Sequence, residues 1–118
     1  MLLIIAAILL IAIGLAHSVL GERYVLIRLF RREVPKLFGS ETYTKRTLRF
    51  AWHITTVAWW GFAALLLASL EDPSRAVYLK IISVTFLVSG VVALVGSRGR
   101  HYSWVVFLAV AVLAWWAA

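Results

Sequence analysis

Residues 50–70 read FAWHITTVAWWGFAALLLASL and contain no Asp, Glu, Lys or Arg. About 20 mostly apolar residues are enough for a helix to cross the hydrocarbon core of a bilayer. The run shows no alternation of apolar and polar residues, which favours a helix over a strand. This stretch therefore predicts a transmembrane helix with one histidine, His53, near its start.

Three further runs have the same apolar character, over residues 2–20, 77–95 and 102–118. Because backbone groups in lipid must hydrogen-bond within their own segment, all four runs are predicted as helices. We expect an all-α integral membrane protein, with residues 1–118 forming one membrane domain built as a four-transmembrane-helix bundle. Residues 21–49 are expected to extend the first two helices into the cytoplasm as a basic amphipathic hairpin.

The overall composition also indicates that the solvent is a bilayer. Of the 118 residues, 64% are hydrophobic and 14% are charged, whereas about 25% of the residues in a soluble domain are charged. The chain has no cysteine, which excludes disulfides and thiolate metal ligands. The first run has neither the basic start nor the cleavage pattern of a signal peptide, so we interpret it as a retained span.

The basic residues predict the orientation in the membrane. The formal net charge is +7, and eight of the twelve Lys and Arg residues lie between Arg23 and Arg49. The loop 96–101 is also basic, whereas the loop between the second and third spans has one arginine and two acidic residues. Loops rich in Lys and Arg stay in the cytoplasm. We therefore expect a bacterial inner-membrane protein with both termini on the non-cytoplasmic side.

The basic hairpin has the residue spacing of an amphipathic helix up to about Val34, and Pro35 predicts a break there. Ser40 is expected to cap the helix that continues into the second span. Basic side chains at a membrane surface gain about 1 kcal/mol each from anionic lipid, so lipid phosphate is the expected partner. The residues expected to contact it are Arg23, Arg28, Arg31, Arg32, Lys36, Lys45 and Arg46. A docking surface for a protein or a nucleic acid is the alternative, although we expect no nucleic-acid partner.

Three histidines, His17, His53 and His101, are predicted at the cytoplasmic side of the membrane. If the hairpin turns near residues 37–38, His53 lies level with Glu22 and His17 lies about 7 Å deeper, at a rise of 1.5 Å per residue. Neutral imidazoles bind transition metals, and two of them on facing helices can hold a haem. The histidines are therefore predicted to hold a transition metal or haem b.

Polar and small residues are expected around this site. The surrounding residues are predicted to be Glu22, Arg49, Thr56 and Trp60. On the first span, Gly14 and Gly21 share a face with His17 and would allow a neighbouring helix or a flat ligand to approach closely. Two other readings remain open. The histidines could pass protons along a path, or they could be polar residues satisfied by carbonyl groups or by Glu22.

Two other groups of residues carry weaker signals. Trp59 and Trp60 lie near the middle of their span, where they either pack against small residues or line a pocket. Small and polar residues within run 77–95 predict that it is the central or dimer-forming helix.

Lys80 lies inside the third span, near its non-cytoplasmic end. A long basic side chain at this depth is expected to extend outward, here toward Glu71 or Asp72. The alternative is an inward-facing lysine that guards a substrate path.

The leading functional hypothesis is a small multi-pass membrane binding or accessory protein whose histidines hold a metal ion or b-type haem. The first alternative is a small dimeric ion or solute transporter with His17, His53 and Lys80 along its path. A structural subunit of a larger membrane complex is the second alternative, and a membrane enzyme acting on a lipid phosphate is also open. The sequence has no HExxH motif, so the signal for metal catalysis is weak. Because the predicted bundle is thin, it is expected to associate with itself or with a larger complex.

Overall fold

The computed structural model describes residues 1–71 and 74–118, and this part of the chain is helical without strands. The main helices are α1 (Leu2–Leu20), α3 (Glu41–Ala68), α4 (Arg75–Ser97) and α5 (Ser103–Trp116). The short elements are the π-helical turn η1 (Gly21–Leu26), α2 (Ile27–Leu29) and the 3₁₀ turns η2 (Leu37–Gly39) and η3 (Ser69–Glu71). The predicted all-α class is confirmed.

Three helical stretches are long and apolar enough to cross a membrane: Leu2–Leu29, Glu41–Glu71 and Arg75–Ser97. The fourth apolar helix, α5, has 14 residues. At 1.5 Å per residue such a helix is about 21 Å long, shorter than a hydrocarbon core of about 30 Å. The first three predicted spans thus have spanning length, whereas the helix in run 102–118 is shorter than expected.

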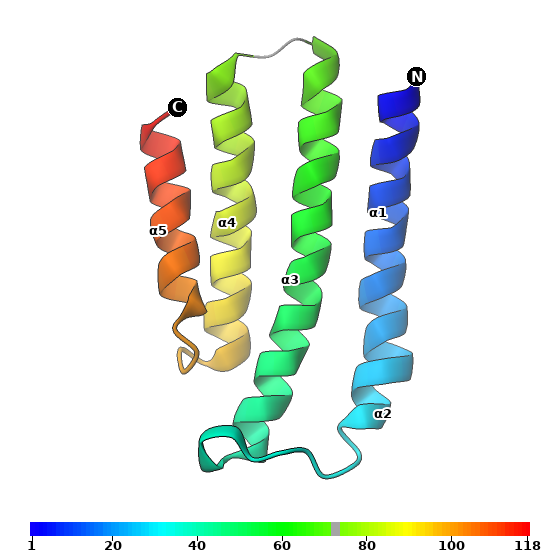
Figure 1. Cartoon of the computed structure of the whole chain (residues 1–118), viewed down its shortest axis with the longest axis vertical. Helices are drawn as coiled ribbons and strands as arrows, with labels where there is room; N and C mark the ends of the chain where they lie inside the picture. The colour runs from blue at the N-terminus through cyan, green and yellow to red at the C-terminus, as the bar shows by residue number, and fades with distance from the viewer. Residues whose placement is uncertain (72–73) are drawn as a thin grey trace.

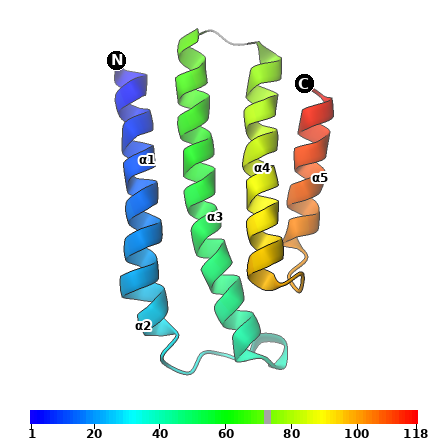
Figure 2. The same ribbon diagram turned by 180° about the vertical axis from the view of Figure 1, so that it is seen from behind.

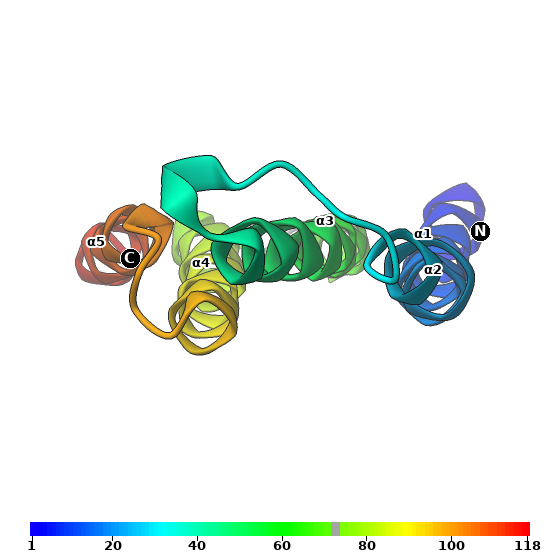
Figure 3. The ribbon, with the colours of Figure 1, turned by 90° about the horizontal axis from the view of Figure 1, so that it is seen from below.

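The four main helices lie in a single row in the order α1, α3, α4, α5 (Figures 1 and 2). The view from the hairpin end shows the same row (Figure 3), and the shortest dimension of the molecule is 15 Å against 50 and 31 Å for the others. This open layer differs from the usual form of a four-helix bundle, in which the helices pack around a common core. A row is possible because lipid, unlike water, imposes little cost on the apolar side chains left on both faces.

Both chain termini lie at one end of the layer, and the hairpin and the α4–α5 loop lie at the other (Figure 1). Both basic loops are therefore at the same end, which is the arrangement that the predicted topology requires. Only 11–22% of the residues in the three spanning windows are buried. A surface this apolar is suited to contact with lipid or with another protein.

Small residues set the distances between the inner helices. The hydroxyl of Ser83 on α4 donates to the carbonyl of Ala111 on α5 at 2.6 Å. A methyl group at Gly61 on α3 would lie 2.6 Å from the side chain of Thr85 on α4. Because α4 packs against both α3 and α5, the predicted inner position of this span is confirmed.

The first arm of the hairpin is shorter than predicted. Its helix ends at Leu29 instead of running to about Val34. The following loop is tied to α3 by Thr44, whose hydroxyl donates to the carbonyl of Pro35 at 2.6 Å and accepts from the amide of Leu37 at 3.1 Å. Because Pro35 and Leu37 are held against α3, the helix has to end before them, and residues 30–36 form the connection from α2 to η2.

The second arm begins as predicted. Ser40 caps α3, since its hydroxyl accepts a hydrogen bond from the amide of Tyr43 at 3.2 Å. The turn before it uses left-handed backbone at Phe38 (φ 49°) and Gly39 (φ 76°). Glycine adopts this conformation without steric cost, which explains why the chain can reverse so sharply just before the cap.

Two glycines bring α1 and α3 close together. A methyl group at Gly14 would lie 2.6 Å from the indole nitrogen of Trp60, and one at Gly21 would overlap the indole of Trp52. Both indoles donate to α1 carbonyls, Trp52 to His17 at 2.9 Å and Trp60 to Ile11 at 3.3 Å. The predicted close approach is confirmed, and the flat groups that occupy it are tryptophan side chains of α3.

We expect Gly14→Val to destabilise the protein by about 1–3 kcal/mol, because the added methyl groups overlap Trp60. Unfolding in SDS, followed by tryptophan fluorescence, measures this change. Ala12→Val is the matched control, since Ala12 is exposed on the same helix, and its effect should stay within about 0.5 kcal/mol. Equal effects of the two substitutions would show that the indole does not occupy the glycine face.

Candidate functional site

Glu22 joins α1 to α3 at the hairpin end of the layer. Its Oε1 atom lies 3.0 Å from Nη2 of Arg49, and its Oε2 atom accepts from Nε of Arg49 at 3.2 Å. The same Oε2 atom lies 3.2 Å from Nε2 of His53. The sequence-based prediction that His53 lies level with Glu22 is therefore confirmed.

The π-helical turn η1 positions this carboxylate. Such turns bond i to i+5, so they hold one residue more than an α-helical turn and change where the following side chains point. Gly21, the first residue of η1, packs against Trp52, and Glu22 follows it directly. The local backbone thus places Glu22 over the face of α3 that carries Arg49 and His53.

The second ring nitrogen of His53 leads into a chain of hydroxyl groups. Nδ1 lies 2.9 Å from the hydroxyl oxygen of Ser18, which lies 2.7 Å from that of Thr56. The Thr56 hydroxyl in turn lies 3.2 Å from the carbonyl oxygen of Gly14. Thr56 is 3% exposed and Gly14 is also buried. A continuous polar chain therefore runs from the half-buried Glu22 into the α1–α3 contact.

The number of available hydrogens fixes the donor directions in this chain. An ionised carboxylate only accepts, so a neutral His53 carries its hydrogen on Nε2 and accepts at Nδ1. Ser18 then donates to His53, and Thr56 donates to Ser18. When His53 is doubly protonated, Nδ1 donates to Ser18, Ser18 donates to Thr56, and Thr56 donates to Gly14. One added proton therefore reverses both hydroxyl donors and gives the Gly14 carbonyl a hydrogen bond.

His17 lies beside this chain without entering it. Its ring stacks on Trp52 with a centroid distance of 4.5 Å and an interplanar angle of 2°. It also contacts Trp59 at 4.9 Å, and its Nε2 atom lies 3.3 Å from the carbonyl oxygen of Trp52. The His17 side chain therefore supports the position of Trp52, which itself fills the space next to Gly21.

His101 lies near the start of α5 and faces a different set of partners. Its Nδ1 atom is 2.9 Å from the hydroxyl of Ser103, and its ring packs against Phe50 at 5.3 Å and Tyr43 at 6.2 Å. All three histidines lie at the hairpin end of the fold, as predicted, but they do not converge. In the described part of the chain, no group of three His, Asp or Glu residues is placed to hold a metal ion.

The predicted haem position between α1 and α3 is also filled by protein. The indoles of Trp52 and Trp60 lie directly against Gly21 and Gly14, and both ring nitrogens of His53 have partners within α1 and η1. The predicted surrounding residues Glu22, Arg49 and Thr56 do gather at His53, whereas Trp60 lies one turn deeper, on Gly14. The contacts thus assemble the predicted neighbours around a single histidine.

The predicted lipid-contacting residues fall into two groups. Lys45 forms an ion pair with Glu41 at 3.1 Å, and the guanidinium groups of Arg23 and Arg28 lie 5.6 and 5.4 Å from the ring of Tyr24. The others have no ion pair within the described residues, and they are Arg31, Arg32, Lys36 and Arg46. Most of this basic surface therefore remains open to an external anion.

Lys80 extends along the layer near its other end. Its ammonium group lies 5.8 Å from the ring centroid of Trp115 on α5, within cation–π range. No ion pair joins it to Glu71 among the residues that the structure describes, and Asp72 lies outside them. The predicted contact of Lys80 with Glu71 is therefore wrong. Lys80 contacts the aromatic ring of Trp115 instead.

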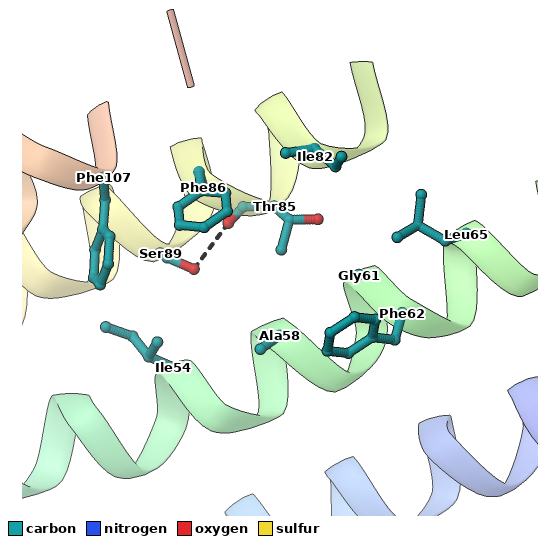
Figure 4. Close-up of a pocket in the computed structure, with 10 residues that line it drawn as sticks. All are labelled: Ile54, Ala58, Gly61, Phe62, Leu65, Ile82, Thr85, Phe86, Ser89 and Phe107. Atoms are coloured by element: carbon teal, nitrogen blue, oxygen red, sulfur yellow. Dashed lines mark hydrogen bonds between the residues drawn. The ribbon is translucent and has the colours of Figure 1, made fainter. Parts of the chain in front are cut away.

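A cavity of about 190 Å³ lies between α3, α4 and α5 and has apolar walls (Figure 4). The hydroxyls of Thr85 and Ser89 donate at 2.8 Å to carbonyls of their own helix, those of Ile81 and Thr85. Binding sites for small molecules usually combine apolar walls with a few convergent polar groups. The polar groups of this cavity are already used, so the Glu22–His53 region is the better candidate.

Sequence reasoning missed two members of the site, Ser18 and Trp52. Ser18 was overlooked beside His17, although Gly14, Ser18 and Glu22 recur every four residues and so share one helix face. From its place at the start of the span, Trp52 is expected only to belong to the aromatic belt at the membrane surface. Its contact with Gly21 depends on how α1 and α3 meet, and no local pattern in the sequence reports that.

We expect Thr56→Val to destabilise the protein by about 0.5–2 kcal/mol, because the isosteric change removes the central hydroxyl of the chain. Thr55→Val is the matched control, since the Thr55 hydroxyl bonds only to the Ala51 carbonyl of its own helix, and its effect should stay below about 0.5 kcal/mol. SDS unfolding of both variants checks the difference. A Thr56→Val protein as stable as the control would contradict the continuous chain.

Comparison of the chain with protein-family models, with curated proteins and with solved structures gives no match. The interpretation of the site therefore rests on its own geometry.

Proposed function

We propose that this protein is a small integral membrane accessory protein that binds a proton at His53 and converts it into a change of hydrogen bonding between α1 and α3. The observation that carries this proposal is the continuous chain from Glu22 through His53, Ser18 and Thr56 to the Gly14 carbonyl. Histidine is the side chain whose charge ordinarily changes within the physiological pH range. The ligand that we propose for the site is thus a proton.

The charges around His53 support this role. Glu22 faces it from η1, and Arg49 neutralises Glu22 from the preceding turn of α3. His17, on α1, is turned onto Trp52, and the cavity beside His53 toward α4 is lined by Val91 and Val92 and by the charged side chain of Arg46. Uptake of one proton therefore changes the net charge of the Glu22–Arg49–His53 group from zero to +1.

The proposed placement in the membrane puts this group at the cytoplasmic surface. In it all four main helices cross the bilayer, both termini lie on the non-cytoplasmic side, and the basic loops meet anionic lipid of the inner membrane. The short α5 crosses where the bilayer thins locally, with Trp104, Trp115 and Trp116 near the interfaces. The open edges of the layer, α1 and α5, are where a second copy or a larger complex would attach.

The end point of the chain favours proton sensing over transport. Within the described residues, the hydrogen bonds beyond Thr56 end at the Gly14 carbonyl, which belongs to the backbone of α1. The ammonium group of Lys80, the other residue considered for a transport path, lies over the Trp115 ring of α5 and takes no part in the α1–α3 hydrogen bonds. A proton that enters at Glu22 therefore alters the α1–α3 contact and goes no further.

We expect the carbonyl carbon of Gly14 to shift downfield on acidification, with the same midpoint as the ring nitrogens of His53, because the protonated form adds a hydrogen bond at this carbonyl. Gly14–Leu15 is the only Gly–Leu pair in the sequence. Labelling glycine with ¹³C at the carbonyl and leucine with ¹⁵N therefore isolates its NMR signal. Before acidification, the ¹⁵N signals should show the His53 hydrogen on Nε2.

The control is Thr56→Val, in which the Gly14 signal should no longer follow the charge of His53. A wild-type Gly14 signal that does not follow His53 would refute the coupling. Proton flux through protein-containing liposomes that is lost in His53→Gln would favour the transporter alternative instead.

A further inference from the structure

A groove between α3 and α4 runs along one face of the layer. It consists of two cavities of about 490 Å³ each. The cavity nearer the hairpin reaches His53 and Val91, and the next begins at Val57 and Val88. These residues are one helical turn apart on each helix, so the two cavities adjoin.

The α4 wall of the groove is a stripe of valines. Val84, Val88, Val91 and Val95 recur at helical spacing and are 42–69% exposed. On the α3 side, Val57, Trp60 and Ala64 continue the apolar lining. The polar lining is concentrated at the two ends, with Arg46, Arg49 and His53 toward the hairpin and Lys80 toward the other end. The middle of the groove is therefore suited to a hydrocarbon chain.

The hairpin end of the groove carries positive charge that is only partly neutralised. Arg49 uses its Nε and Nη2 atoms on Glu22 and is 46% exposed. Arg46 also lines the groove and has no ion pair among the residues that the structure describes. A guanidinium group donates in a planar fork that matches phosphate oxygens. This end of the groove is therefore suited to a phosphate.

We propose that the groove binds one anionic, phosphate-bearing lipid of the cytoplasmic leaflet, with its headgroup at Arg46 and an acyl chain along the valines. A soluble phosphate would leave the valine wall uncovered, and an uncharged hydrocarbon would leave Arg46 without an anion. From residue 46 to residue 64, α3 rises about 27 Å, so the groove can hold an acyl chain over the roughly 15 Å of hydrocarbon in one leaflet of a core about 30 Å thick. The charge of the hairpin end and the apolar wall beyond it thus point to the same ligand.

Arg49 and His53 belong to the proposed proton-binding group and also line this groove, but the two proposals can be tested separately. Arg46 and Val91 take no part in the hydrogen-bonded chain between α1 and α3. Variants at these two positions therefore test lipid binding and leave the chain intact, whether or not the Gly14 signal follows the charge of His53.

Native mass spectrometry of the full-length protein in detergent tests the proposal with phosphatidylglycerol as the probe. We expect one lipid to bind at least tenfold more tightly than phosphatidylcholine, whose choline group shields the phosphate. Oleate should bind more weakly because it lacks the phosphate, and glycerol 3-phosphate should not compete because it lacks the chain. Oleate binding as tight as phosphatidylglycerol, or competition by glycerol 3-phosphate, would overturn the assignment of a phosphate lipid.

Two pairs of variants locate the site. Arg46→Gln should weaken phosphatidylglycerol binding at least tenfold, whereas Arg75→Gln, which removes the same charge from the exposed start of α4 at the other end of the layer, should leave it unchanged. Val91→Trp should abolish lipid binding because the larger side chain fills the groove. Val106→Trp is the control, since Val106 lies on α5 and is 62% exposed, and this change should leave lipid binding intact. Equal losses within either pair, or no retained lipid in the wild-type protein, would overturn the proposal. For each variant, an SDS unfolding transition like that of the wild-type protein shows that the variant is folded.

Discussion

The close contact between α1 and α3 is the constraint on which the rest of the site depends. It exists because Gly14 and Gly21 have no side chains, so the indoles of Trp60 and Trp52 lie directly on the backbone of α1. Both indoles then hydrogen-bond to α1 carbonyls, which fixes the rotation of one helix against the other. That rotation turns the remaining polar side chains of the two helices toward each other.

Polar side chains between these helices are tolerated because each has a partner. Unpaired polar groups in an apolar environment are costly, and the chain from Glu22 to the Gly14 carbonyl satisfies them one after another. Each hydroxyl in the chain has one hydrogen to donate. The direction in which Ser18 and Thr56 donate therefore depends on the proton at His53. The hydrogen bonds that stabilise the α1–α3 contact therefore also make it respond to the charge of His53.

Helix α3 connects the two proposed sites. One of its sides meets α1 through Thr56, another forms a groove with α4 through Arg46 and Val57, and His53 borders both. The helices form an open row (Figure 3), so α3 can contact a neighbouring helix on each side and still present a groove at the face of the layer. A closed bundle would have covered that groove with protein.

The sequence by itself determined the helical class, the apolar runs, the clustering of basic loops at one end and the cap at Ser40, because these depend on composition and spacing within single segments. It also placed Glu22 level with His53, since hairpin geometry follows from helical rise. Only the tertiary structure decided that the helices form a row, that Trp52 fills the space at Gly21 and that the three histidines do not converge. Those outcomes depend on how helices rotate about their own axes, and that rotation is set by contacts between residues far apart in the chain.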